Sequence, residues 1–255
     1  MTADLHIRAL KQQLVTSAGG FLRNLVAAGT CSRCYTPQRV GGLCGTCRFH
    51  GSPPGLPDAR GFMTYASWAE PIQQSGWVMR KYKEPIPVPS AERTVRLLAA
   101  LAVRGHRHCP ARLVGAPLTA WAHVPSLPAR PGTAHPLATI LRSLARPGSI
   151  EIVLDGVANP ADPRALDAAN FAVRSDVPDG GHVLLIEDTW VGGGHAQSAA
   201  LALRAAGTAH VSLLAIARWL TVGWDETTDA WIRAHLAGAD YNPDICPWTQ
   251  QACPA

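Results

Sequence analysis

The chain has 255 residues, of which 47% are hydrophobic and 16% are charged. This length allows one large domain, or one domain with a small additional module. No apolar run approaches the roughly 18 residues of a membrane-spanning helix, and the first residues lack the apolar core of a signal peptide. We therefore expect a cytoplasmic protein that does not enter membranes.

Charge is divided unevenly along the chain. Residues 1–112 carry a net charge of +10, and residues 113–255 carry a net charge of −5. The basic half could contact nucleic acid or a polyphosphate substrate. A solvated surface beside an acidic catalytic domain explains the same pattern, and composition alone favours that explanation.

The first predicted segment, residues 1–30, is helical. Apolar residues recur at helical spacing between Leu5 and Ala28, and the glycine pair Gly19–Gly20 predicts a break in the helix. A linker at residues 50–58, rich in glycine and proline, separates the N-terminal part of the chain from the rest.

Four patterned cysteines occupy the segment at residues 31–50. Cys31 and Cys34 form one Cys-x2-Cys pair, and Cys44 and Cys47 form a second pair nine residues further on. Two such pairs complete a tetrahedral site, and without a secretion signal they are typical of metal ligands rather than disulfides. Four thiolates leave no position for water or substrate. We therefore predict a structural zinc ribbon, whose metal stabilises a segment too small to build its own core.

Strands and helices alternate through the predicted main domain, residues 60–240. Alternation of this kind predicts βαβ units and a mostly parallel sheet. Thr227 or Thr228 would cap the last helix, and residues 241–255 form a C-terminal tail. The predicted strands are residues 118–124, 150–154, 183–187 and 211–217, and the predicted helices are residues 91–103, 136–145, 196–206 and 227–236.

Three further cysteines, Cys109, Cys246 and Cys253, are scattered along the chain. Cys109 lies close to His106 and His108 in the sequence. A second metal site is one interpretation, but these spacings match no common ligand set. Free thiols, with histidines on a surface loop, are the interpretation that the sequence favours.

The stretch from His182 to Ala200 carries the most information about function. Four apolar residues run into the adjacent acids Glu187 and Asp188, and three glycines and an alanine-rich helix pattern follow. This order predicts a buried parallel strand that leads into a glycine loop at a helix N-terminus. Backbone N–H groups and the helix dipole favour an anion such as phosphate there. With two acids in reach of sugar hydroxyls or a metal, the stretch indicates a phosphorylated sugar as ligand.

This order of strand, acid pair, glycine loop and helix, next to a four-cysteine ribbon, resembles the type I phosphoribosyltransferases, in particular their competence-associated, ComF-like branch. The resemblance covers most of residues 31–220. It implies an α/β fold with a type I phosphoribosyltransferase-like parallel sheet flanked by helices, and a small N-terminal zinc ribbon. It also implies phosphoribosyl pyrophosphate and Mg²⁺ as ligands, and transfer of the phosphoribosyl group to a nucleophile such as a nucleobase.

The resemblance also implies roles for individual residues. Glu187 and Asp188 match the family's acids that bind the ribose hydroxyls of phosphoribosyl pyrophosphate. Lys83 and Arg130 are candidates for binding its pyrophosphate group. The loop around the 5′-phosphate corresponds to Val191, Gly192, Gly193, Gly194 and His195.

The phosphate loop departs from the family pattern. Threonines usually occupy the positions of Val191, Gly192 and His195. Each lost hydroxyl contact costs about 0.5–1.5 kcal/mol, although the backbone N–H groups remain and a protonated His195 could add a charge-assisted bond. The family's polar stretch after Val124–Pro125 is reduced as well.

Two hypotheses of function therefore remain open. The first is an enzyme that transfers phosphoribosyl with Mg²⁺, which the retained acids favour. The second is a catalytically degenerate binding module that acts in DNA uptake or nucleic-acid metabolism, through the ribbon and the basic half. The missing threonines favour this second hypothesis.

Overall fold

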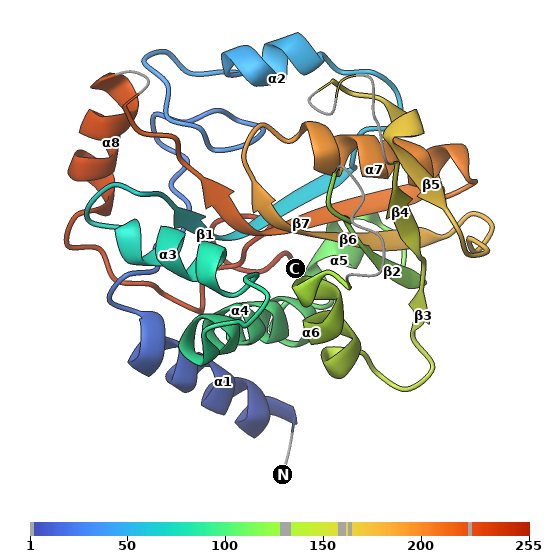
Figure 1. Ribbon diagram of the computed structural model, residues 1–255, viewed down its shortest axis with the longest axis horizontal. Coiled ribbons are helices and arrows are strands. Elements are labelled where there is room, and N and C mark those ends of the chain that lie inside the picture. The colour runs from blue at the N-terminus through green and yellow to red at the C-terminus, as the bar shows by residue number, and fades with distance from the viewer. Residues whose placement is uncertain (1–2, 128–133, 158–161, 163–164, 224–225) are drawn as a thin grey trace.

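A five-stranded sheet, in which all strands are parallel, forms the centre of the molecule (Figure 1). The computed structural model describes residues 3–127, 134–157, 162, 165–223 and 226–255. From one edge to the other, the strands are β1 (Ala59–Ala66), β7 (His210–Trp219), β6 (His182–Trp190), β2 (Ala120–His123) and β3 (Ile150–Glu151).

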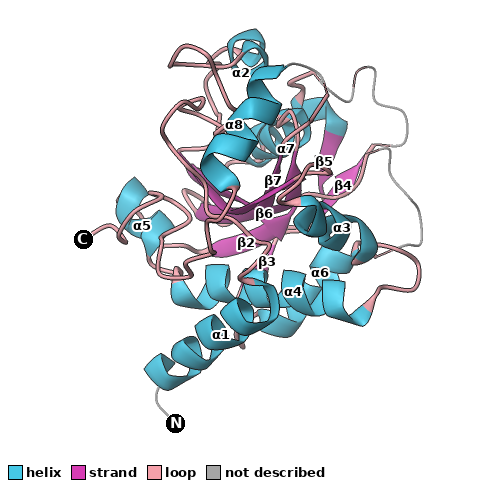
Figure 2. Ribbon diagram, turned by 90° about the vertical axis from the view of Figure 1, so that its left-hand side faces the viewer, coloured by secondary structure: helices cyan, strands magenta, loops and turns pink. Residues whose placement is uncertain are grey.

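Helices cover both faces of this sheet, which Figure 2 shows between them. On one face the apolar core is shared with α1 (Ala3–Ala18), α3 (Gln73–Lys81), α4 (Pro89–Ala100), α5 (Cys109–Val114) and α6 (Pro136–Leu144). A five-residue π-helical turn, η1 (Leu101–Gly105), continues α4. The other face is covered by α7 (Gly194–Ala205), α8 (Glu226–Leu236) and the four-cysteine segment, which contains α2 (Gly45–His50).

The central strand β6 shows why the sheet needs cover on both faces. Leu184 and Ile186 join the core under α4 and α6, and Val183 and Leu185 join the core under α7. Successive side chains of a strand point to opposite faces, so an uninterrupted apolar run is the pattern of a parallel strand buried on both sides.

A two-stranded antiparallel hairpin lies outside this sheet. It pairs β4 (Leu154–Gly156) with β5 (Phe171–Val173), which follows the short 3-10 helix η2 (Ala168–Asn170). Both β5 and η2 lie against α7.

The structure confirms the α/β class and the parallel sheet flanked by helices, and it corrects several element boundaries. The first helix ends at Ala18, directly before the break predicted at Gly19–Gly20, but no helix follows the break as far as Ala28. The last helix begins at Glu226, so Thr227 and Thr228 lie inside its first turn and do not cap it. The predicted strand at residues 150–154 is split into β3 and β4, which belong to different sheets.

Strand β1 was not predicted at all. Its sequence, Ala59–Ala66, contains Arg60, Gly61 and Thr64, which interrupt the apolar pattern, although six of its eight residues are buried. Among the described residues, no helix has both the length and the apolar character needed to cross a membrane.

Candidate functional site

The order of the strands reverses between β2 and β6. These two strands are neighbours, but the chain leaves β2 through α6 for β3 on one side, and leaves β6 through α7 for β7 on the other. In open α/β sheets, ligands bind outside the carboxyl ends of the strands at such a reversal of strand order. The ends of β2, at His123, and of β6, at Trp190, therefore define the candidate site.

Asp188, near the end of β6, is the centre of a polar cluster. Its side chain is buried, and Oδ2 accepts hydrogen bonds from Tyr82 Oη and Lys83 Nζ, both at 2.6 Å. Nε2 of His135, the residue before α6, lies 3.6 Å from the same oxygen. Residues far apart in the sequence thus meet at one carboxylate, and Lys83 is one of the residues expected at this site.

Glu187 is buried beside Asp188 but has different partners. Its Oε1 accepts hydrogen bonds from the backbone N–H groups of Asp188, at 3.0 Å, and Thr189, at 3.4 Å. Burial, and then the charge of Asp188, raises the pKa of Glu187 well above its usual value. Burial opposes ionisation of Asp188 too, but the positive charges of Lys83 and His135 outweigh it and lower the pKa of Asp188. The negative charge of the pair therefore belongs to Asp188.

His123 ends β2, the strand next to β6. Its side chain is buried, and its ring centroid lies 6.1 Å from that of His135. Burial, together with the neighbouring His135, lowers the pKa of His123 to about 4, so its imidazole is neutral at physiological pH.

The glycine loop joins the end of β6 to the N-terminus of α7. Gly193 caps the helix with φ +83°, and a Cβ at this position would overlap the buried indole ring of Trp190. Only glycine fits both conditions. Val191 and Gly192 are exposed. Because the first N–H groups of a helix have no partner within it, the loop and the start of α7 could hold an anion.

Arg218, on β7, connects this loop to the cysteine segment. Its side chain is buried, with Nε donating to the carbonyl oxygen of Cys34 at 2.6 Å, and Nη1 donating to those of Trp190 and Val191 at 3.0 and 2.9 Å. Sequence reasoning missed this residue. The available signal was a single arginine inside the apolar run of β7.

Gln197 forms a second connection between the loop and the cysteine segment. Its Nε2 donates to the carbonyl oxygen of Gly193 at 3.2 Å and lies 3.1 Å from Nδ1 of His50, at the end of α2. The loop is therefore held by side chains from β7 and α7, next to the four cysteines.

The four N-terminal cysteines are buried and converge on one point. Their Sγ atoms lie within 4.8 Å of one another, with 3.7 Å between those of Cys34 and Cys44. Backbone N–H groups point at the sulfurs: Cys44 N–H donates to Cys31 Sγ at 3.3 Å, and Cys47 N–H to Cys44 Sγ at 3.4 Å. This cluster could hold a metal ion.

The remaining expected residues are placed as follows. Gly194 and His195 form the first turn of α7, with Gly194 buried and His195 partly buried. Arg130 lies outside the described residues. Of the two residues expected to bind pyrophosphate, the structure therefore places Lys83, which lies against Asp188.

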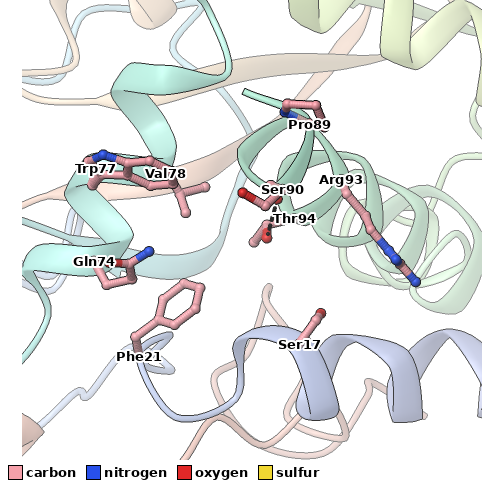
Figure 3. Close-up of a pocket in the computed structure, with 9 residues that line it drawn as sticks. All are labelled: Ser17, Phe21, Gln74, Trp77, Val78, Pro89, Ser90, Arg93 and Thr94. Carbon is pink, nitrogen blue, oxygen red and sulfur yellow. Dashed lines mark hydrogen bonds between the residues drawn. The ribbon is translucent and has the colours of Figure 1, made fainter. Parts of the chain in front are cut away.

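A separate cavity of about 400 Å³ lies between α1, α3 and α4 (Figure 3). Its lining includes Phe21, Trp77 and Arg93, and contains no residue of the acid pair, the glycine loop or the cysteines. We therefore assign the candidate site to the carboxyl edge of the sheet and not to this cavity.

Comparison with known proteins adds no family to these observations. No model of a known protein family matches the chain, and no curated protein matches it significantly.

Proposed function

We propose that the carboxyl ends of β2 and β6 bind phosphoribosyl pyrophosphate with Mg²⁺, and that the protein transfers the phosphoribosyl group to a nucleophile such as a nucleobase. One observation carries this proposal: an acid pair and a glycine loop at a helix N-terminus lie together at the reversal of strand order.

The ribose and the 5′-phosphate would use different parts of the site. The exposed loop at Val191 and Gly192, with the first N–H groups of α7, suits the phosphate. The buried carboxyl groups of Glu187 and Asp188 suit the ribose hydroxyls, which can donate hydrogen bonds to them. Lys83 is about one-third exposed and lies against Asp188, where it can meet a pyrophosphate oxygen.

The oxygen donors of the site fit Mg²⁺. This ion prefers oxygen ligands, keeps several waters, and is commonly held by one or two carboxylates together with substrate phosphates. Asp188, which carries the charge of the pair, would be the residue closest to it. Bound Mg²⁺ would neutralise part of the charge of the pyrophosphate.

In the transfer step, these residues would position the ligand and stabilise charge. As the bond from the ribosyl carbon to pyrophosphate breaks, positive charge develops on the sugar, and a nucleophile attacks the same carbon. Asp188 would stabilise that charge, and Glu187 would orient the ribose. The neutral imidazole of His123 adds no charge that would oppose it.

We propose Zn²⁺ for the cluster of Cys31, Cys34, Cys44 and Cys47. The fit rests on four buried thiols, on backbone N–H groups aimed at two of the sulfurs, and on the buried cation of Arg218 next to Cys34. Four thiolates form a closed structural site. Through Arg218, this site would hold the carbonyl groups of the phosphate loop in place.

Calorimetric titration with phosphoribosyl pyrophosphate and Mg²⁺ tests the proposal. Asp188→Asn removes a charged acceptor, and losing a hydrogen bond to a charged group costs about 1.5–3 kcal/mol. We expect binding to weaken by about 10–100-fold. The matched control is Asp155→Asn, which removes an exposed acid on β4 that pairs with Arg174, and it should bind like the unmodified protein.

Two results would count against the proposal. One is the absence of heat with the unmodified protein at millimolar ligand, and the other is equal affinity in all three proteins. In either case, salt-dependent binding of DNA by the same protein would favour the nucleic-acid binding module.

A further inference from the structure

A second cluster of metal-ligand residues lies where α5 meets the C-terminal segment. His106, Cys109 and Cys246 are buried and Cys253 is exposed, and one potential ligand atom from each lies within 4.8 Å of the others. Residues more than 130 positions apart in the sequence meet here. Figures 1 and 2 both show the C-terminal end of the chain beside α5.

The distances within this cluster suit one tetrahedral ion. His106 Nδ1 lies 3.4 Å from Cys253 Sγ and 3.9 Å from Cys109 Sγ. Ligands at about 2.0–2.3 Å from a tetrahedral Zn²⁺ lie about 3.5–3.8 Å from one another. Both distances are measured to Nδ1, so Nδ1 is the nitrogen that faces the sulfurs. Among the described residues, the buried Nε2 has no hydrogen-bond partner.

Local backbone structure prepares both halves of the cluster. After the π-helical turn η1, Cys109 N–H donates to the carbonyl oxygen of His106 at 3.1 Å, and this turn brings the two side chains to the same place. In the C-terminal half, Gln250 adopts φ +57°, and its N–H donates to the carbonyl oxygen of Cys246 at 2.8 Å. Cys246 N–H in turn donates to the carbonyl oxygen of Gln251 at 2.7 Å, which closes a tight loop between Cys246 and Cys253.

The cysteines of this cluster, Cys109, Cys246 and Cys253, are all free thiols, so no disulfide joins any two of them. A disulfide would use only two of the four groups and leave the imidazole without a role.

We propose that His106, Cys109, Cys246 and Cys253 form a second structural zinc site. Three thiolates and one neutral imidazole are an established ligand set for structural Zn²⁺. Binding of one Zn²⁺ releases the three thiol protons to solvent. The ion joins the C-terminal segment to α5, which lies against β1 and β7, and so stabilises the fold at that edge.

Elemental analysis of the full chain, purified under reducing conditions with zinc present, tests this site. We expect two Zn²⁺ per chain in the unmodified protein and one in the double variant Cys246→Ser/Cys253→Ser. The matched control Gln251→Ser changes an exposed residue of the same loop and should keep two. The variant Cys31→Ser/Cys34→Ser should lose one Zn²⁺ and keep the second site, which separates the two clusters.

X-ray absorption at the zinc edge of the unmodified protein needs no variant and therefore does not depend on a variant's folding. If both sites are filled, the two ions together have seven sulfur ligands and one nitrogen ligand. A single Zn²⁺ with sulfur ligands only, or a Cys109–Cys246 disulfide under reducing conditions, would overturn the proposal.

Discussion

At the scale of single residues, the two adjacent acids of β6 are unequal. Glu187 and Asp188 are both buried, but among the described residues it is Asp188 that accepts a hydrogen bond from Lys83, and His135 Nε2 lies 3.6 Å from the same oxygen. The pKa values therefore move in opposite directions, up for Glu187 and down for Asp188. Adjacent carboxyl groups of the same strand thus have different protonation states, and this difference depends on the environment rather than on residue type.

The raised pKa of Glu187 predicts a pH-dependent cost in stability. Above the ordinary value of 4.5 the unfolded carboxyl ionises while the folded one keeps its proton, so stability falls as pH rises through this range. Glu187→Gln removes this effect and can still accept the two backbone hydrogen bonds. We expect it to stabilise the protein at pH 8 by about 1–2 kcal/mol, or about 2–8 °C in Tm, and by much less at pH 4.5.

Thermal melts at pH 4.5 and pH 8 measure this gain. Glu92→Gln, at a partly exposed acid of α4 that pairs with Arg96, is the control and should show no such dependence. A Glu187→Gln variant that is less stable than the unmodified protein at pH 8 would contradict the assigned protonation states.

At the scale of elements, two glycines in the turn from β6 into α7 have different surroundings. Gly193 must adopt a left-handed conformation directly over the ring of Trp190, whereas a Cβ on Gly192 would come no closer than 3.8 Å, to the methyl group of Thr46. Under the proposed function, the structural role and the ligand-binding role therefore belong to different glycines. Gly193 holds the shape of the loop, and Gly192 would leave the backbone open to an anion.

Alanine substitutions distinguish these two roles. Gly193→Ala should cost about 2–4 kcal/mol, because left-handed backbone is unfavourable for alanine and Trp190 must move. Gly192→Ala should leave stability within about 1 kcal/mol. Chemical unfolding of both variants gives the comparison, and equal losses would show that the loop has a different conformation.

The sequence predicted those elements whose pattern is local. The apolar run of β6, the glycine loop and the helix α7 follow one another without interruption. The four cysteines are recognised as metal ligands by their spacing. Strand β1 was missed because polar residues interrupt it, although most of it is buried under other elements. Arg218 could not be assigned, because its carbonyl partners come from two other segments of the chain.

His106, in the second cluster, is another residue whose partners are distant in the sequence and could not be predicted from it. The prediction that the histidines near Cys109 lie on a surface loop is wrong for His106, which is buried. Its cysteine neighbours Cys246 and Cys253 belong to the other end of the chain. Ligand spacing is a usable signal only within a short segment, and here the fold, not the spacing, brings the groups together.

At the scale of the whole molecule, the sheet separates the two cysteine-containing clusters. The four-cysteine cluster belongs to the core on the α7 face, and Cys109 and Cys246 belong to the core on the opposite face. The candidate ligand site lies between these faces, at the carboxyl ends of β2 and β6. Among the described residues, Arg218 and Gln197 join the four-cysteine segment to that site by direct contacts, at Cys34 and His50 respectively.

Amide hydrogen exchange of the full chain, with and without phosphoribosyl pyrophosphate and Mg²⁺, tests the central claim most directly, because it locates the ligand. We predict slower exchange at the backbone N–H groups of residues 191–197 and at the ends of β2 and β6 when the ligand is present. Exchange in α1 should not change. Unaltered exchange throughout, or slowing confined to the helices around the separate cavity, would contradict a ligand site at the carboxyl edge of the sheet.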